Sequence, residues 1–166
     1  MKDLKPQKIG GVGSIVEIDE SLFSKRKYNV GRLVRRVWIV GGIELRKRDT
    51  FFVEVIKRDA ETLENIILEN VLPGTTIYTD CWKGYINLDK LGYNHLTVNH
   101  SHYFIDPETS ANTQLIENSW GIFKRKIRAR GLKMVDNIGY TFTEFLFKKR
   151  FGSEAFIEIM RNIKIN

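Results

Sequence analysis

The stretch VEIDES, Val16–Ser21, places an aspartate inside a segment that otherwise predicts an apolar β-strand. Aspartate is depleted in strands because its side chain prefers to hydrogen-bond nearby backbone groups in turns and caps. A charge near the buried face of a sheet also costs free energy unless a partner offsets it. Asp19 therefore predicts a functional site that brings a cation to this carboxylate. The alternative is a structural partner, a lysine or arginine that reaches Asp19 across the sheet.

The composition predicts one folded domain that attracts polyanions. The chain has 166 residues, and its hydrophobic content of 42% is enough for a single core. Lys and Arg number 27 against 20 Asp and Glu, and the resulting net charge of +7 favours a nucleic-acid partner. Charge alone does not exclude a merely basic protein.

Cysteine content and hydropathy predict the cellular compartment of the protein. Cys81 is the only cysteine, which excludes an internal disulfide and a cysteine-based zinc module and indicates a reducing compartment. No apolar run approaches the roughly 18 residues of a membrane span, and the N-terminus lacks the apolar core of a secretory signal. We therefore expect an intracellular protein without a membrane partner.

The order of predicted elements indicates one mixed α/β domain. Residues 1–14 are polar and glycine-rich and predict an irregular lead-in to a domain that spans residues 15–166. The predicted elements are strands at 15–19, 37–43 and 51–56, a helix opened by Asp59, a strand at 75–78, a short helix at 85–91, a strand at 95–98, and helices at 113–130, 140–149 and 154–163.

Three consecutive strands followed by a crossover helix and a parallel strand leave few topologies. One of them is a ribonuclease H-like α/β fold, a mixed five-stranded sheet flanked by helices. Asp19 and Asp80 close the first and fourth predicted strands. Because the ends of such strands lie side by side in open α/β sheets, we expect these two carboxylates to be neighbours. The alternative for Asp80 is a turn-forming aspartate that binds local amides.

Glu117 is the third candidate carboxylate. An apolar stripe on the helix at 113–130 is formed by Ile116, Trp120, Phe123 and Ile127 and should pack on the sheet. Glu117 lies beside this stripe, in line with Lys124 and Arg128, and should face the two aspartates. The alternative for Glu117 is a solvated pair with Lys124.

Three converging carboxylates without histidine or cysteine predict a site for Mg²⁺ or Mn²⁺, because like charges need a cation and hard cations prefer oxygen ligands. Two such ions about 3.5 to 4 Å apart clamp the attacking and leaving oxygens of an in-line phosphoryl transfer. In this interpretation Asp19 bridges both ions, while Asp80 and Glu117 each hold one.

Basic residues flank the predicted site on two segments. The candidate DNA-binding residues are Lys25, Arg26, Arg35 and Arg36 between the first strands, and Lys124, Arg125, Arg128 and Arg130 along the long helix. A charge run is often only a solvated face, but its position beside the carboxylates favours contacts with a phosphate backbone.

Several motifs resemble one family. VEIDES, IYTDCWKGY, VNHSHYFIDPET, TQLIENSWGIFKRKIR and TEFLFKKRF are similar to the catalytic core of Merlin-type DDE transposases and the related bacterial ISXO-like group, over about residues 10–151. The resemblance implies that Asp19, Asp80 and Glu117 form the DDE triad, and that Lys124 contacts transposon-end DNA. It also implies Mg²⁺-dependent cut-and-paste transposition on a ribonuclease H-like fold.

The resemblance further implies a homodimer that joins transposon ends to target DNA in a synaptic complex. We expect such a protein in the nucleus of a eukaryotic host, or in the cytoplasm or nucleoid of a bacterial one. The chain has Asn112 where many relatives have histidine, and the 18 residues before Asp19 are too few for the end-recognition domain that many relatives carry. Two other functions remain open: a nuclease that does not join strands, and a non-catalytic DNA-binding remnant of a mobile element.

Overall fold

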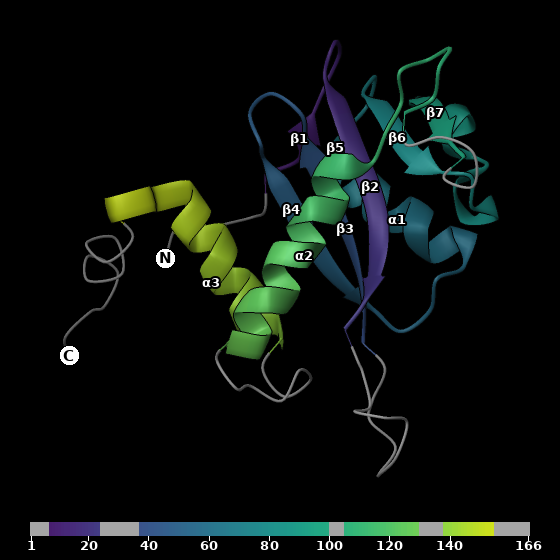
Figure 1. Cartoon of the computed structure of the whole chain (residues 1–166). Helices are drawn as coiled ribbons and strands as arrows, with labels where there is room; N and C mark the ends of the chain where they lie inside the picture. The colour runs from purple at the N-terminus through teal and green to yellow at the C-terminus, as the bar shows by residue number, and fades with distance from the viewer. Residues whose placement is uncertain (1–6, 24–36, 100–104, 130–137, 155–166) are drawn as a thin grey trace.

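A central five-stranded sheet with helices on both faces organises the protein (Figure 1). The computed structural model describes residues 7–23, 37–99, 105–129 and 138–154. The strands are β1 (Ile9–Gly10), β2 (Ile15–Leu22), β3 (Trp38–Glu44), β4 (Thr50–Val55), β5 (Val71–Leu72), β6 (Thr76–Asp80) and β7 (Asn94–Val98). The helices are α1 (Ala60–Asn70), α2 (Gln114–Ala129) and α3 (Ile138–Phe151), with short 3₁₀ helices at Lys83–Tyr85, Leu88–Leu91 and Gly152–Glu154.

The sheet has the strand order β4-β3-β2-β6-β7. The first three of these strands in the sequence, β2, β3 and β4, form an antiparallel meander, and β6 and β7 run parallel to β2. The predicted mixed five-stranded sheet is therefore confirmed. β2 lies at its centre, where the antiparallel and parallel halves meet.

Two apolar cores lie on opposite faces of the sheet. On one face α1 packs through Leu63, Ile66 and Ile67 against the sheet. On the other face the predicted α2 stripe is buried and meets α3 through Phe142. Burying such apolar side chains contributes roughly 1.5 to 3 kcal/mol each, which makes these faces the main source of stability.

Local signals explain where several elements begin and end. Asp59 caps α1 as predicted, because its carboxylate accepts a hydrogen bond from the Thr62 amide at 3.0 Å. Gly92 ends the second short helix with a φ of 87°, a left-handed conformation that costs glycine little. The predicted short helix at 85–91 is replaced by the two 3₁₀ helices.

Two other boundaries differ from the prediction. β2 continues past Asp19 to Leu22, because Leu22 still pairs with Trp38 of β3. The lead-in contains β1, which pairs with β5 in a separate two-stranded sheet. Most of the helix predicted at 154–163 lies outside the described residues.

Candidate active site

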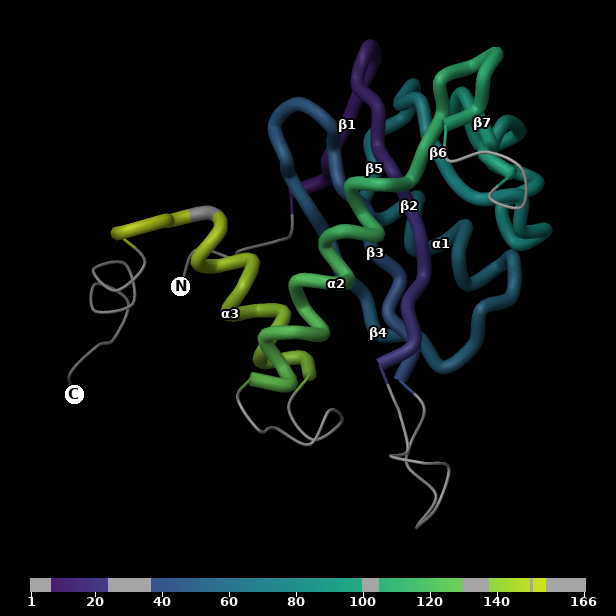
Figure 2. Tube along the Cα trace, in the orientation of Figure 1, coloured from purple at the N-terminus to yellow at the C-terminus, as the bar shows by residue number. Residues whose placement is uncertain are grey.

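One face of β2 faces α2 and meets it at three successive levels. Ile116 N donates to Glu17 Oε2 at 2.9 Å, Trp120 Nε1 donates to Asp19 Oδ2 at 3.0 Å, and Lys124 Nζ donates to Ser21 Oγ at 2.6 Å. Alternate strand residues are about 6.6 Å apart and four helical residues rise about 6 Å, so the two spacings nearly match. This match aligns α2 along β2 (Figure 2).

Glu17 fixes the start of α2. Its side chain is only 1% exposed, and its carboxylate accepts from the Ile116 amide, with the Leu115 amide also within reach. Burial raises the pKa of Glu17, whereas these two amides act to lower it. The first amides of a helix have no partner within the helix, so an acid on a neighbouring strand can cap them. Glu17 thereby sets the position of Glu117, one residue after Ile116.

We expect Glu17→Ala to lower the free energy of unfolding by about 2 kcal/mol, because it leaves buried amides without an acceptor. Glu17→Gln should lose less than half as much, since its side-chain oxygen still accepts a hydrogen bond. Urea denaturation measures both. Glu69→Ala, at an exposed position of α1, is the control and should change stability by under about 0.5 kcal/mol. A Glu17→Ala variant as stable as the control would contradict this capping role.

Asp19 is a half-buried carboxylate with an unusually high proton affinity. Its pKa is raised to about 6, mainly by burial; the negative charges of Asp80 and Glu117 add to the rise, and the hydrogen bond from Trp120 acts to lower the pKa. No lysine or arginine pairs with Asp19 among the described residues. Within those residues, the alternative of a lysine or arginine that pairs with Asp19 across the sheet is therefore not observed. The Asp19 carboxylate is instead close enough to Asp80 and Glu117 for their charges to act on it.

Gly41 makes room for the indole that holds Asp19. Gly41 pairs directly with Asp19 across β2 and β3. A Cβ atom at Gly41 would lie 2.4 Å from Cη2 of Trp120 and 2.8 Å from Cδ1 of Phe52. Only a residue without a side chain allows the Trp120 ring to lie across β3 and donate to Asp19.

Asp80 lies beside Asp19 on the neighbouring parallel strand. Glu17 pairs with Tyr78, so two residues further along both strands Asp19 and Asp80 occupy corresponding positions. Asp80 Oδ1 accepts from the Trp82 amide at 3.0 Å, as in the turn-forming alternative. Its second oxygen has no hydrogen bond to any residue that the structure describes. One carboxylate oxygen thus orients the side chain and the other is available.

Glu117 is exposed at the first turn of α2, beside the two aspartates. The buried Thr113 hydroxyl donates to Glu117 Oε1 at 2.7 Å. Glu117 is close enough to raise the pKa of both Glu17 and Asp19. Within the described ranges, however, no three acidic, histidine or cysteine side chains are close enough to form a ready metal cluster. The three predicted residues are neighbours that do not converge on one point.

Part of the predicted basic surface lies along α2. Lys124 is half-buried against β2 beside Ser21 and Phe23, and its ammonium lies 5.2 Å from the Phe23 ring. Arg125 and Arg128 are exposed, and Arg128 Nε donates to the Lys124 carbonyl at 3.0 Å. The other predicted DNA-binding residues, Lys25, Arg26, Arg35, Arg36 and Arg130, lie outside the described residues.

The opposite face of β2 carries a half-buried acid, Glu20, which the sequence analysis did not identify. Glu20 accepts a hydrogen bond from the Tyr85 hydroxyl. Burial raises the pKa of Glu20 to about 7, the Tyr85 hydrogen bond opposes the rise, and the charges of Asp19 and Asp80 add to it. The sequence signal for this pair was Glu20, the third acid of VEIDES, together with Tyr85, which lies five residues after Asp80. Two acids of this stretch thus face α2, and the third faces Tyr85 on the opposite side of the sheet.

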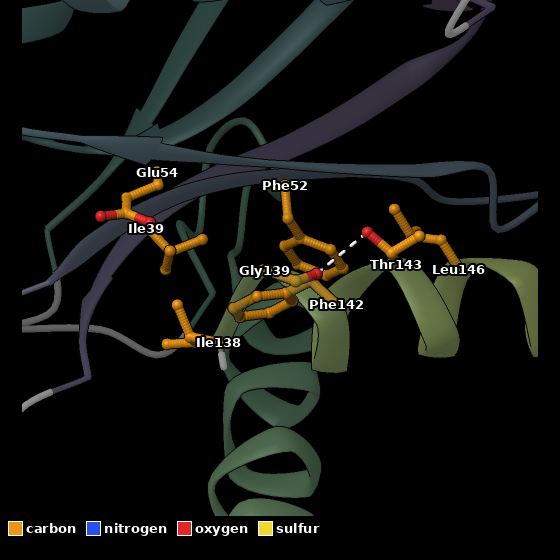
Figure 3. Close-up of a pocket in the computed structure, with 8 residues that line it drawn as sticks. All are labelled: Ile39, Phe52, Glu54, Ile138, Gly139, Phe142, Thr143 and Leu146. Carbon is orange, nitrogen blue, oxygen red and sulfur yellow. Dashed lines mark hydrogen bonds between the residues drawn. The ribbon is translucent and has the colours of Figure 1, made fainter. Parts of the chain in front are cut away.

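A cavity of about 160 Å³ lies away from these carboxylates, between β3, β4 and α3 (Figure 3). It is lined by Ile39, Phe52, Glu54, Ile138, Gly139, Phe142, Thr143 and Leu146. Thr143 is one of its polar members, and its hydroxyl donates to the Gly139 carbonyl at 2.9 Å. None of the three predicted catalytic carboxylates lines it, so we assign it no part in the chemistry.

Solved structures share this fold. The HTLV-2 integrase catalytic core, solved with magnesium in a trimeric form, superposes with a TM-score of 0.56 at 13% identity, covering 86% of this chain and 88% of that one. Its dimeric form gives 0.53 at 14% identity, covering 89% and 88%. The simian T-cell lymphotropic virus intasome, solved with a PP2A regulatory subunit, gives 0.53 at 14% identity, covering 87% and 52%. Integrase catalytic cores have a ribonuclease H-like fold, so that prediction is confirmed.

The sequence then identifies the family. Residues 11–135 match the ISXO2-like transposase domain, and the chain belongs to this family. An uncharacterized transposase-like protein of Haemophilus influenzae is 33% identical over 82 residues, which are 49% of this chain and 65% of that protein. The resemblance to ISXO-like transposases is therefore confirmed. No helix in the described part of the chain is long and apolar enough to cross a membrane.

Proposed function

We propose that this chain is a metal-dependent DNA transposase domain that cuts and joins DNA at Asp19, Asp80 and Glu117. The observation that carries the proposal is the pairing of β2 with β6, which puts Asp19 and Asp80 at corresponding positions of adjacent parallel strands beside the start of α2. Membership of a transposase family and a net charge of +7 support DNA as the substrate.

The residues present fit the divalent cations that this reaction needs. Asp19, Asp80 and Glu117 offer only carboxylate oxygens, the donors that Mg²⁺ and Mn²⁺ prefer. Burial is the main cause of the raised pKa of Asp19, and the negative charges of Asp80 and Glu117 add to it, so a bound cation would favour the ionised carboxylate. These three residues would hold two ions, which when bound supply the Lewis acidity that activates an oxygen nucleophile and stabilises charge on the phosphate. Magnesium in the HTLV-2 integrase core supports this assignment.

The chain's own residues orient the reactants. Trp120 holds Asp19 in place through its indole N–H, and the Trp82 amide does the same for Asp80. Lys124, Arg125 and Arg128 extend along α2 from Glu117 and would bind backbone phosphates, whose contacts position DNA without reading its sequence. In the first step water displaces the 3′ oxygen of a phosphodiester at an element end. In the second step that 3′ hydroxyl attacks a target phosphate and displaces another 3′ oxygen.

Two ends must be cut together, so we propose a homodimer that acts in a synaptic complex inside the cell. The dimeric and trimeric forms of the HTLV-2 integrase core support assembly of this fold. The two alternative functions predict different products. A nuclease on the same fold hydrolyses DNA without joining it, and a non-catalytic remnant only binds it.

The test is a nicking and strand-transfer assay with precut DNA from the ends of the element that encodes the chain. With Mg²⁺ or Mn²⁺ we expect joined products, and chelation of the metal should remove them. Nicks without joining would instead support the nuclease. Salt-sensitive DNA binding with neither product would support the remnant and overturn the proposed activity.

A further inference from the structure

Arg58 lies between two tryptophan rings at the end of the sheet. Its guanidinium carbon is 3.4 Å from the centroid of the Trp38 ring and 5.1 Å from that of Trp82. The three residues come from separate parts of the chain: the start of β3, the segment before α1, and the turn after β6. Attraction between a guanidinium and aromatic faces holds the side chain in one orientation.

The stacked guanidinium keeps its hydrogen-bonding edge available. Arg58 is half-buried, yet it makes no hydrogen bond or ion pair with the described residues. The nearby carboxylate of Glu20 accepts from Tyr85 instead, and Arg58 acts on it only through its charge. Stacking occupies the faces of a guanidinium, whereas its N–H donors point outward in the plane and suit a phosphate.

The stack adjoins the carboxylates of the candidate active site. The Trp82 amide donates to Asp80 Oδ1, so one ring of the stack follows directly from the turn that orients Asp80. Trp38 pairs with Leu22, the last residue of β2, three positions after Asp19. A DNA strand bound at Asp19 and Asp80 and leaving past the end of the sheet would therefore pass this cation.

We propose that Arg58, held flat by Trp38 and Trp82, binds a backbone phosphate of the DNA strand that lies at the active site. This inference rests on the proposed function, because it takes DNA as the substrate. It adds a contact on the α1 side of the sheet to the basic residues on α2. The competing interpretation is that Arg58 only stabilises the fold by stacking on the two tryptophan rings. That interpretation predicts no effect on the salt dependence of DNA binding.

The experiment compares Arg58→Ala, Arg58→Lys and Arg46→Ala in binding a labelled duplex over a range of salt concentrations. Arg46 is an exposed cation in the turn between β3 and β4, beyond Glu44, which pairs with the opposite end of β2. Arg58→Ala should weaken binding about tenfold and reduce the slope of log K against log salt by about one. Arg58→Lys should keep the slope and weaken binding less, because the charge remains without the planar stack. Arg46→Ala should change binding by less than about twofold.

Melting temperatures show whether each variant is folded. Arg58→Ala could melt at a lower temperature and still bind DNA with the wild-type slope of log K against log salt. In that case the stack of Arg58 on the tryptophans is purely structural and the inference is wrong. A loss of affinity that does not change with salt would also overturn it, because that result indicates base stacking on the tryptophans. If the wild-type protein cuts and joins DNA, but Arg58→Ala binds DNA as tightly as Arg46→Ala does, only this inference is overturned. Wild-type protein that neither binds nor cuts DNA would overturn the proposed function as well.

Discussion

Asp19→Asn is expected to abolish nicking and joining of DNA while it stabilises the metal-free protein at pH 8. Asparagine keeps the shape of the side chain and an oxygen that accepts from Trp120, but it removes the negative charge that would hold the ions. Activity should fall by about 10³-fold or more, the order expected when one member of a catalytic unit is removed. The strand-transfer assay measures this loss.

The gain in stability follows from the raised pKa of Asp19. Burial raises that pKa from 3.8 to about 6 in the folded protein, against the hydrogen bond from Trp120. Between these two values the folded state holds a proton that the unfolded state has released, so stability falls as the pH rises through 6. At pH 8 the ionised, partly exposed carboxylate costs about 2 kcal/mol. Asp19→Asn should recover that amount at pH 8 and only about a third of it near pH 4.5.

Denaturation with urea at both pH values, without divalent ions, tests this pattern. Asp49→Asn in the exposed turn before β4 is the matched control, and it should change neither activity nor the pH dependence. Mg²⁺ should stabilise the wild-type protein at pH 8 and have little effect on Asp19→Asn. If Asp19→Asn nicks DNA as fast as Asp49→Asn does, Asp19 is not a catalytic residue.

Gly41→Ala is expected to destabilise the protein by about 2 to 3 kcal/mol and to weaken DNA cleavage as well. The added Cβ would meet Trp120 at 2.4 Å and Phe52 at 2.8 Å, so both rings must move within a packed core. Movement of the indole would break its hydrogen bond to Asp19. Urea denaturation gives the loss of stability, and cleavage rates at saturating metal give the second effect.

Gly121→Ala is the matched control, because a Cβ there meets nothing within 4 Å. In the middle of α2 alanine is preferred over glycine, so this variant should gain about 0.5 to 1 kcal/mol. A smaller ring at Trp120 should relieve the clash, so Gly41→Ala combined with Trp120→Phe should lose less stability than the two single losses added together. Strictly additive losses would mean that Gly41 and Trp120 do not share this space.

Much of the fold could be predicted because its signals are local. β-branched runs predicted the strands, and Asp59 predicted the start of α1 through its cap. The extent of β2 could not be predicted, since its last residues are held by pairing with Trp38 rather than by their own preference. The pairing of β1 with β5 was missed for the same reason, because it joins residues far apart in the sequence.

For the candidate site, residue type and chain order were enough to select Asp19, Asp80 and Glu117. They were not enough to show that Glu17 caps α2, that Glu20 binds Tyr85, or that two tryptophans hold Arg58. Each of these contacts depends on which face of β2 a side chain occupies and on what packs there. A shift of one residue in strand register would exchange the two faces.

The sequence by itself therefore determined the fold class, the family and the choice of candidate site residues, because these depend on patterns within short segments. Only the tertiary structure decided how the acids of VEIDES divide their roles. The register of β2 against β3 and β6 directs Glu17 and Asp19 toward α2 and Glu20 toward Tyr85. That division arises from hydrogen bonds between segments up to about a hundred residues apart, which no local pattern encodes.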